Sequence, residues 1–331
     1  GLSGVYAYPG TPSTEITEYI QLHEAKAAQP SIFCRWASNE KTAMEGALGM
    51  SYMGKRALVC MKHVGMNVCA DAFMNAAITG VNGGLVVVAA DDPSMHSSQN
   101  EQDSRFYAKF AMIPCFEPTN QQEAYEMTKE AFRLSEELRT PILLRVTTRM
   151  AHSRAVVETA DNTPVQNQMS LPENVQHFIL LPAFAKKNYA ELVAAQPTFV
   201  HKSETSPFNS YVKGTHPERG IITTGIAYNY LMENYQPAMG CSILKVAQYP
   251  LPVALINQMV ADGAKEILVI EEGQPVVEEL IHGLVPSSVA VKGRLTGDLP
   301  RMGELTPDSV RLAIGLDALP TREADNLVVN R

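Results

Sequence analysis

A fully apolar run from Leu85 to Ala90 constrains the fold of this chain more than any other segment. Gly83-Gly84 precedes it and Asp91-Asp92 follows it, and this short length between turn residues favours a strand over a helix. A strand without alternating polar residues must be buried on both faces, as in a parallel sheet with helices on each side. The sequence therefore predicts an α/β fold in which strands and helices alternate along the chain.

Strand and helix patterns alternate over residues 1–155, which we expect to form the first domain. Short apolar runs predict strands over Val5–Tyr8, Ser31–Trp36, Arg56–Met61, Gly84–Ala90 and Ile142–Val146. Amphipathic or small-residue stretches predict helices over Thr14–Ala27, from Glu40 onward, after Asn67, and over Gln122–Leu138. The expected architecture is a parallel sheet layered between helices.

The rest of the chain divides into three segments. Residues 156–216 are rich in Pro, Asn, Gln and Ser, and we expect a connecting segment with one helix over Ala183–Ala194. Residues 217–300 predict a second, smaller α/β domain with strands over Ile221–Thr224, Ser242–Val246, Glu266–Ile270 and Val289–Val291. Its helices are expected within Gly225–Glu233, Pro252–Val260 and Pro275–Leu284. Residues 301–331 read as a linker or tail with a short helix over Pro307–Ile314.

The composition excludes several classes of function. The net charge of −8 and the scattered basic residues leave no positive patch of the kind that nucleic acids bind. No apolar run reaches the roughly 18 residues of a membrane span, and no signal peptide is evident. The five cysteines show no C-x-x-C spacing, which disfavours a disulfide framework and a zinc or iron–sulfur ligand run. We therefore expect a reducing cytoplasm and no metal site in this chain.

Glu40 is the most informative single residue. It begins a predicted helix after the start signal Ser38-Asn39. Small residues at Ala43 and Gly46 give that helix a surface that another backbone or a ligand can approach closely. An ordinary first-turn acid, favoured by the helix dipole, is the structural alternative, and the position taken alone supports this alternative.

The segment after the first predicted strand, Tyr8–Glu15, is a second candidate, because chemistry gathers at the carboxyl ends of strands in α/β sheets. Gly10 permits an unusual backbone angle, and Thr11 or Ser13 can cap the helix that follows. Helix capping alone is the alternative explanation.

Two more polar segments follow predicted strands. In the expected loop Met61–Asn67, the glycine and its polar neighbours can offer backbone N–H groups and a cation to an anion or a polar ring. The long loop Asp91–Asp103 is almost entirely polar, and such loops in compact domains are often functional. A satisfied loop histidine and a solvated surface loop are the respective alternatives.

Four common catalytic motifs are missing from the sequence. There is no G-x-G-x-x-G after a strand, no G-x-x-x-x-G-K-[ST], no G-x-S-x-G and no H-E-x-x-H. Dinucleotide oxidoreductases, P-loop NTPases, serine hydrolases and zinc proteases therefore lose their usual support.

Together these segments resemble the pyrimidine-binding half of thiamine diphosphate enzymes in the 2-oxoacid:ferredoxin oxidoreductase family, nearest to its indolepyruvate-type α subunits. The resemblance covers most of residues 1–155 and is carried by Tyr8–Ile16, Asn39–Lys41, Met61–Val68, Gly83–Pro93, His96–Arg105 and Thr147–Ser153. The segments Thr223–Tyr228 and Val269–Gly273 resemble the family's transketolase C-terminal-like domain. The implied fold is a parallel-sheet thiamine-diphosphate-binding domain of the pyrimidine type, followed by a smaller transketolase C-terminal-like α/β domain.

The resemblance implies a catalytic role for Glu40. In thiamine enzymes a glutamate hydrogen-bonds the aminopyrimidine ring nitrogen and helps the ring amine remove a proton from the thiazolium, so that the cofactor can attack a 2-oxo acid. A carboxyl with this role must lie in a largely dry pocket, where it can share a proton with the ring.

The same resemblance implies further contacts. The implied cofactor-binding residues are Gly10, Thr11, Glu40, Gly65 and Asn67. The implied substrate contacts are Thr11, Lys62, His63, His96, Ser97 and Gln99.

Some parts of the family pattern are missing. The Gly-Asp-Gly turn of the diphosphate-binding domain has no match, since the chain has only Gly297-Asp298-Leu299. We therefore expect the diphosphate and its Mg²⁺ to be held outside this chain segment, and [4Fe-4S] clusters to lie elsewhere in the complex. The chain is expected to be a fragment or a split subunit that works as a homodimer or in an α/β-type hetero-oligomer.

The implied function is oxidative decarboxylation of an aryl 2-oxo acid of the indolepyruvate type to an acyl-CoA. Coenzyme A would be the second substrate, and ferredoxin or a similar carrier would accept the electrons. Two alternatives stay open: a non-oxidative thiamine-dependent decarboxylase and a non-catalytic assembly paralogue. The second unit at 217–300 favours the oxidoreductase over the decarboxylase, and Glu40 argues against the paralogue.

Overall fold

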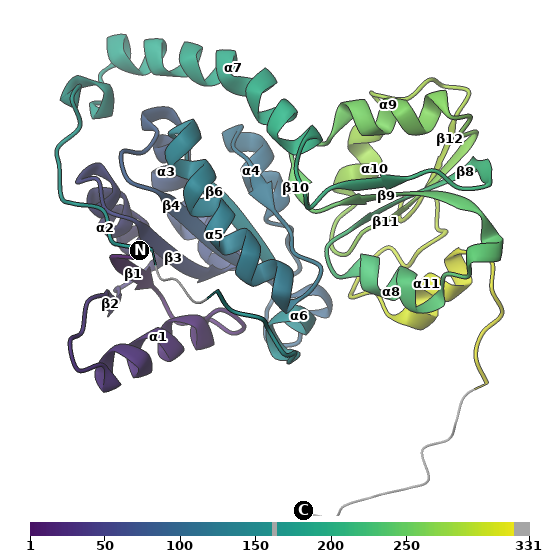
Figure 1. Cartoon of the computed structure of the whole chain (residues 1–331), viewed down its shortest axis with the longest axis horizontal. Helices are drawn as coiled ribbons and strands as arrows, with labels where there is room; N and C mark the ends of the chain where they lie inside the picture. The colour runs from purple at the N-terminus through teal and green to yellow at the C-terminus, as the bar shows by residue number, and fades with distance from the viewer. Residues whose placement is uncertain (161–163, 321–331) are drawn as a thin grey trace, which may run out of the picture.

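The computed structural model describes residues 1–160 and 164–320, which form two parallel-rich sheets layered between helices (Figure 1). The larger sheet has the strand order β10-β5-β6-β4-β3-β1-β2, and the smaller sheet has the order β12-β11-β8-β9-β7. Within each sheet the pairs are parallel except β10 with β5 and β7 with β9. The predicted α/β fold with a smaller second unit is confirmed.

The elements have the following bounds. The larger sheet consists of β1 (Gly4–Ala7), β2 (Phe33–Trp36), β3 (Ala57–Lys62), β4 (Leu85–Asp91), β5 (Cys115–Phe116), β6 (Ile142–Thr147) and β10 (Gln248–Tyr249). The smaller sheet consists of β7 (Ser210–Val212), β8 (His216–Thr224), β9 (Cys241–Val246), β11 (Glu266–Ile270) and β12 (Ala290–Lys292). The helices around the larger sheet are α1 (Thr14–Lys26), α2 (Glu40–Tyr52), α3 (His63–Thr79), α4 (Arg105–Ala111), α5 (Gln121–Leu138), α6 (Thr148–His152) and α7 (Pro182–Glu204). Those around the smaller sheet are α8 (Ala227–Asn234), α9 (Val253–Ala261), α10 (Val276–Ile281) and α11 (Pro307–Ala313), and short 3₁₀ turns occupy Pro93–Met95, Val175–Phe178 and Pro237–Met239.

The apolar run of β4 lies at the centre of the larger sheet, as its sequence predicts. All of its residues are buried, and β4 pairs in parallel with β3 on one side and β6 on the other. Because parallel register aligns the strand ends, Lys62 of β3 lies beside Ala90, and Thr147 of β6 lies beside Asp91. The polar residues that follow these strands are therefore delivered to one edge of the sheet.

Several predicted elements have different bounds in the structure, and the strand expected over Ile221–Thr224 begins already at His216. The loop expected over Met61–Asn67 is wrong, because α3 begins at His63 directly after β3. Helix α7 continues well beyond Ala194 and contains Pro197. The burial of Leu192 and Phe199 on either side of this proline supplies packing that offsets the lost backbone hydrogen bond.

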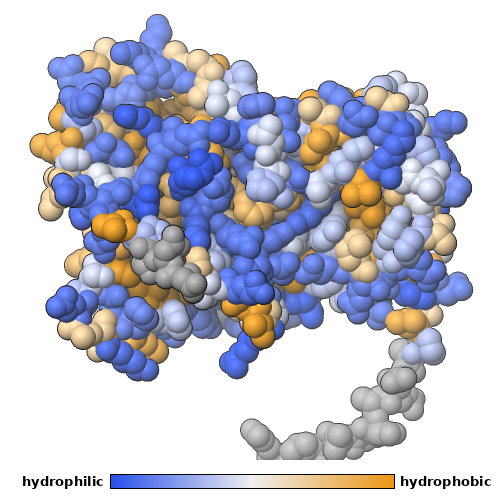
Figure 2. Space-filling view, viewed as in Figure 1, coloured by the Kyte–Doolittle hydropathy of each residue, from blue (hydrophilic) through white to orange (hydrophobic). Residues whose placement is uncertain are grey.

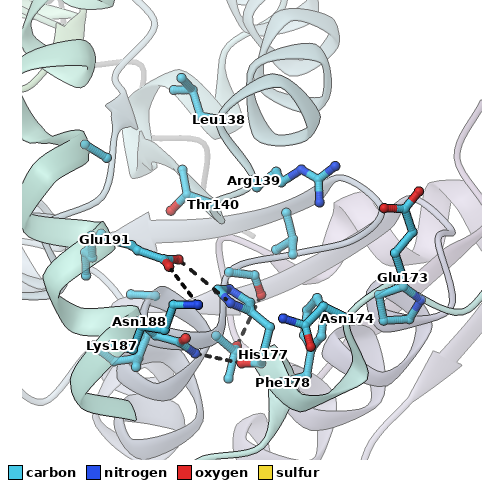
Figure 3. Close-up of a pocket in the computed structure, with 18 of the residues that line it drawn as sticks. Leu138, Arg139, Thr140, Glu173, Asn174, His177, Phe178, Lys187, Asn188 and Glu191 are labelled. Atoms are coloured by element: carbon cyan, nitrogen blue, oxygen red, sulfur yellow. Dashed lines mark hydrogen bonds and ion pairs between the residues drawn. The ribbon is translucent and has the colours of Figure 1, made fainter. Parts of the chain in front are cut away.

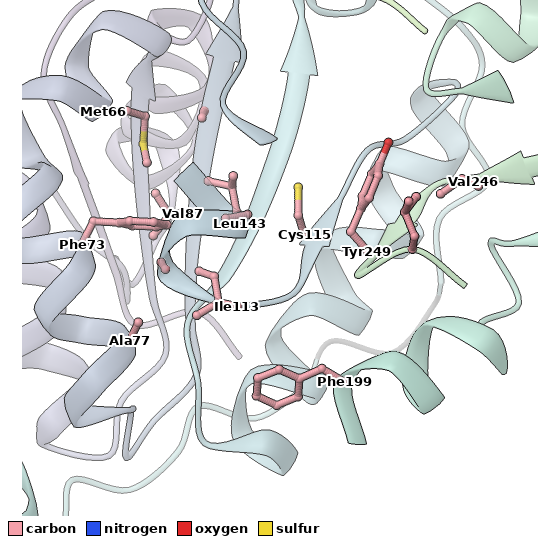
Figure 4. Close-up of a cluster of buried hydrophobic side chains, with 14 of the residues drawn as sticks. Met66, Phe73, Ala77, Val87, Ile113, Cys115, Leu143, Phe199, Val246 and Tyr249 are labelled. Carbon is pink, nitrogen blue, oxygen red and sulfur yellow. The ribbon is translucent and has the colours of Figure 1, made fainter. Parts of the chain in front are cut away.

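The two units share a core. Strand β10 follows β9 of the smaller sheet but pairs with β5 of the larger one, with Tyr249 opposite Cys115. A single apolar cluster includes Phe73 and Leu143 beside the larger sheet and Val246 of the smaller one (Figure 4). The face in Figure 2 is mostly hydrophilic, with apolar side chains in small separate groups. The two units are therefore packed as one body around a continuous interior.

Candidate active site

The candidate residues gather at the carboxyl edge of the larger sheet, where β1, β3, β4 and β6 end. Residues 8–13 follow β1, α3 follows β3 at once, residues 92–104 follow β4, and α6 follows β6. Four connections therefore meet at one edge, and side chains from distant parts of the sequence become neighbours there.

Glu40 occupies the first position of α2. The Asn39 side chain accepts a hydrogen bond from the Thr42 backbone N–H (2.9 Å), and the Thr42 hydroxyl accepts one from the Asn39 N–H (3.3 Å), so a capping box fixes the start of the helix. Glu40 is 8 % exposed, and its carboxylate has no hydrogen-bond or ion-pair partner within residues 1–160 and 164–320. The carboxylate oxygens are not fully sealed from solvent, so a largely buried carboxylate of this kind is open to a hydrogen bond from a ligand.

Gly65 explains how this carboxylate is accommodated. A Cβ atom at position 65 would lie only 2.5 Å from Glu40 Cγ and 2.8 Å from Glu40 Oε1. No residue with a side chain fits there without displacing the glutamate. Gly65 on α3 therefore provides the space that the Glu40 side chain occupies.

Lys62 at the end of β3 is held by the loop that follows β4. Its ammonium donates hydrogen bonds to the Ser97 carbonyl oxygen (2.8 Å) and hydroxyl (3.1 Å), and lies 3.8 Å from Asp92 Oδ2. Burial lowers the pKa of this ammonium, which the charge of Asp92 partly opposes. Gly10 packs on the lysine stem, since a Cβ there would be 3.1 Å from Lys62 Cβ.

Asp92 organises the same loop, although its sequence position gave no separate signal of this role. Its carboxylate accepts hydrogen bonds from the Ser97 N–H (2.9 Å), the Ser98 hydroxyl (2.5 Å) and the Thr148 hydroxyl (2.7 Å). Burial raises the pKa of Asp92, but these hydrogen bonds and the charge of Lys62 outweigh burial and bring the pKa to about 2. The ionised carboxylate thus ties the ends of β3, β4 and β6 together.

The two remaining α3 candidates point to different surroundings. His63 is buried, with Nε2 lying 3.3 Å from the Asn100 carbonyl oxygen, while its Nδ1 has no partner among the described residues. Asn67 is exposed and accepts a hydrogen bond from the Tyr107 hydroxyl of α4. Gly65 and Asn67 are two residues apart on the helix, so they do not face the same side.

A cavity of about 560 Å³ opens beside this edge. It is lined by Thr11, His96, Ser97, Thr148, Arg149, His152, Ser153 and Glu304. Three of the predicted residues, Thr11, His96 and Ser97, therefore come together, and Ser97 Oγ donates to the Thr11 carbonyl oxygen at 3.3 Å. Gln99 is exposed and does not line this cavity.

Two charged residues of this cavity are not among the site residues that the sequence predicts. Arg149 Nη2 lies 2.5 Å from Glu304 Oε1, and His96 Nε2 lies 3.4 Å from Glu304 Oε2. Arg149 is the second residue after β6, a position that could have marked it. Glu304 comes from the second unit, and nothing in its sequence surroundings indicates its place here.

The first 212 residues decide the family. They match the family described as pyruvate flavodoxin/ferredoxin oxidoreductase, thiamine diphosphate-binding. The chain belongs to this family.

Curated relatives of this family member agree with that placement. The indolepyruvate oxidoreductase subunit IorA of Methanothermobacter marburgensis is 39 % identical over 330 residues, which is 98 % of this chain and 53 % of the relative. IorA of Pyrococcus horikoshii is 40 % identical over 291 residues, or 85 % of this chain and 44 % of the relative. The 2-oxoglutarate synthase subunit KorA of Methanothermobacter thermautotrophicus is 25 % identical over 170 residues, which is 49 % of this chain and 44 % of the relative. The chain thus spans about half the length of the curated IorA proteins it matches.

Solved structures share the fold of this family member. A 2-oxoglutarate:ferredoxin oxidoreductase from Magnetococcus marinus has a TM-score of 0.71 at 16 % identity, covering 95 % of this chain and 62 % of that chain. A split-gene transketolase, in its inactive β4 tetramer, has a TM-score of 0.56 at 15 % identity, covering 94 % and 90 %. Both share the two-unit α/β fold of this chain.

Two properties bear on cofactors and membranes. Within residues 1–160 and 164–320, no three His, Cys, Asp or Glu side chains are grouped so that they can hold a metal ion. None of the helices in these residues has the length and apolar character needed to cross a membrane.

Proposed function

We propose that this chain is the pyrimidine-binding part of a thiamine diphosphate-dependent 2-oxoacid oxidoreductase that acts on aryl 2-oxo acids of the indolepyruvate type. The complete complex would decarboxylate the oxo acid, form an acyl-CoA and pass electrons to ferredoxin or a similar carrier. Family membership and the IorA relatives support this class of reaction. The observation that carries the proposal is the buried, unpartnered carboxylate of Glu40 on Gly65 at the strand-end edge.

The surroundings of Glu40 fit an aminopyrimidine ring. When bound, thiamine diphosphate supplies the carbon nucleophile and the electron sink for decarboxylation. The Glu40 carboxyl would hydrogen-bond the ring nitrogen, and its place at the start of α2 against α3 leaves the residue only 8 % exposed. Gly10 and Thr11 approach from the β1 end, next to Lys62.

The cavity beside this edge suits the 2-oxo acid. Arg149 is the cation best placed for the substrate carboxylate, because its side chain lines this cavity whereas Lys62 does not. His96 and Ser97 complete the polar side of the cavity. The guanidinium of Arg149 forms an ion pair with the Glu304 carboxylate, so the substrate carboxylate would compete with Glu304 for Arg149.

The remaining cofactor contacts are assigned outside this chain segment. The diphosphate with its Mg²⁺ and the [4Fe-4S] clusters would be held by further residues or by a partner chain, in a homodimer or an α/β-type hetero-oligomer. A cytoplasmic location belongs to the same proposal, because the five cysteines are unpaired thiols within the described residues.

The test is turnover by the purified complex with indolepyruvate, coenzyme A, thiamine diphosphate and a dye as electron acceptor. Glu40→Gln keeps the size of the side chain and removes its acidic proton. We expect turnover to fall by about two to four orders of magnitude, with thermal unfolding nearly unchanged. The matched control is Glu45→Gln on the exposed side of α2. Unchanged turnover in Glu40→Gln would refute the proposed mechanism, and a complex without iron–sulfur clusters would refute the oxidoreductase.

A further inference from the structure

A second cavity lies at the opposite edge of the larger sheet, beneath α7 (Figure 3). It measures about 390 Å³, and its wall includes Val81, which precedes β4, and Thr140, which precedes β6. The active-site candidates follow these strands, whereas this cavity adjoins the residues that precede them. The two cavities have no lining residue in common.

The wall of this cavity carries hydrogen-bonding groups that the protein does not use. Thr140 is 3 % exposed, and its hydroxyl has no partner within the described residues. Asn188 of α7 is equally buried and donates from Nδ2 to the His177 carbonyl oxygen at 2.6 Å, but its Oδ1 accepts no hydrogen bond from that part of the chain. Buried polar groups are normally satisfied, so the Thr140 hydroxyl, which is fully buried without a partner among the described residues, favours a polar ligand.

Both signs of charge surround the same space. Arg139, next to Thr140, is an exposed residue that lines the cavity, and its guanidinium has no ion-pair or hydrogen-bond partner in residues 1–160 and 164–320. Glu191 of α7 lies 3.9 Å from His177 Nδ1 and 3.8 Å from Lys187 Nζ, at the outer limit of an ion pair. Figure 3 shows the carboxylate of Glu191 on one side and the guanidinium of Arg139 on another. A cation and a carboxylate are thus both available to a ligand.

The rest of the wall combines polar residues, Glu173 and Asn174 among them, with several apolar side chains. Phe178 packs edge-on against Tyr52, with ring centroids 4.6 Å apart, and Phe199 of α7 is 2 % exposed. Leu138 and Leu192 add aliphatic surface. The cavity volume falls in the range of about 300–1,000 Å³ that is usual for small-molecule sites.

We propose that this cavity binds an α-amino acid with a large apolar side chain. The carboxylate would pair with Arg139, the ammonium would pair with Glu191, and the side chain would lie against Phe178. A purely anionic ligand would meet the charge of Glu191, and a purely apolar one would leave the Thr140 hydroxyl without a partner. The proposal does not depend on the thiamine chemistry, because no active-site candidate lines this cavity.

The direct test is isothermal titration calorimetry of the full chain with L-phenylalanine, L-leucine and L-tryptophan, at ligand concentrations that reach about 10 mM and so detect millimolar Kd values. We expect saturable binding of at least one of them. Glycine, 3-phenylpropionate and phenethylamine, which lack the side chain, the ammonium and the carboxylate respectively, should each bind at least tenfold more weakly. No binding by any of the three amino acids, or equal binding of 3-phenylpropionate, would overturn the proposal.

Variants locate the site. Arg139→Asn removes the cation and suits the positive φ of 52° at this position, and Thr140→Val removes only the hydroxyl. Each should weaken amino-acid binding by about tenfold or more, because each removes a partner of the ligand. The matched control is Lys186→Asn, an exposed cation on α7 that does not line the cavity. Affinity that stays unchanged in both site variants would place the binding elsewhere and reject this assignment, and circular dichroism of each variant verifies its fold.

Discussion

At the scale of single residues, Gly65 leaves no room for a larger side chain at the candidate active site. Gly65→Ala adds one methyl group at 2.5 Å from Glu40 Cγ, a distance that real side chains do not show. The glutamate must therefore move. We expect thiamine diphosphate affinity and turnover to fall at least tenfold, with a modest loss of stability of about 1–3 kcal/mol.

The control for Gly65→Ala is Gly49→Ala on α2, where an added Cβ would meet nothing within 4 Å. That substitution should leave cofactor affinity unchanged and raise helix stability slightly. Fluorescence titration of the cofactor and urea unfolding measure the two effects separately. Wild-type affinity in Gly65→Ala would show that the Glu40 position does not depend on this glycine.

The lowered pKa of Asp92 predicts how the stability of the protein depends on pH. This pKa is about 2 in the folded chain, and the ordinary value is 3.8. A carboxyl whose pKa is lowered by folding stabilises the protein above its unfolded-state pKa, and this contribution is lost as the pH falls toward the folded-state value. Asp92→Asn should therefore be less stable than the wild type at pH 7, by about 1–3 kcal/mol.

The stability difference between the wild type and Asp92→Asn should be constant above about pH 5 and should shrink as the pH falls through 3.8. Urea unfolding of both proteins over this pH range measures it. Asp71→Asn, at a mostly exposed carboxylate on α3, is the control and should differ little from the wild type. A difference that stays the same down to pH 3 would contradict the role assigned to the Asp92 charge.

At the scale of elements, sequence patterns succeeded where a segment is long and uniform. The sequence predicts β4 and α5 correctly. In β4 every residue is apolar or buried, and in α5 the apolar residues recur with helical spacing over many residues. The two-residue strands β5 and β10 and the short α4 escaped detection, since so few residues carry no periodicity. Helix α3 starts earlier than its sequence predicts, because the polar residues Lys62 and His63 are typical of a loop although His63 is fully buried.

The candidate site shows the same limit of prediction from sequence patterns. Glu40, Thr11, His96 and Ser97 follow predicted strands or begin a predicted helix, so pattern and resemblance could find them. Glu304 could not be found in this way. Its place depends on contacts between two loops far apart in sequence, in which Glu304 N–H donates to Ser94 Oγ at 2.8 Å.

This loop contact predicts an effect on substrate affinity. Glu304 Oε1 lies 2.5 Å from Arg149 Nη2 and forms an ion pair with it. Glu304→Gln should weaken this interaction and free the guanidinium for the substrate carboxylate. We expect the KM for the 2-oxo acid to fall about three- to tenfold, with kcat changed less. Steady-state kinetics of the complex measures both constants, and Glu101→Gln, in the same loop contact but outside the cavity, is the control. A rise in KM would mean that Glu304 orients Arg149 instead of competing for it.

At the scale of the whole molecule, a buried charge cluster joins the two units. Arg145 of β6 is fully buried, with Nε 2.6 Å from Asp91 Oδ2 and Nη1 paired with Glu117, and it donates to the Glu272 carbonyl oxygen of the second unit at 2.9 Å. Arg105 of α4 similarly reaches Glu271 Oε2 at 2.8 Å. The second unit is therefore held to the first through charges as well as through the shared core.

Arg145→Met tests this connection, because it keeps a long side chain but leaves the neighbouring carboxylates buried without their cation. Removing one partner of a buried ion pair typically costs about 3–5 kcal/mol. We expect that loss in urea unfolding, and calorimetry should show two separate transitions in place of the single one expected for the wild type.

Arg133→Met is the matched control, since Arg133 forms two ion pairs with Glu130 and Glu137 on the exposed side of α5. It should lose less than about 1 kcal/mol, because solvent screens exposed pairs. Equal losses in the two variants would show that the buried cluster does not hold the units together.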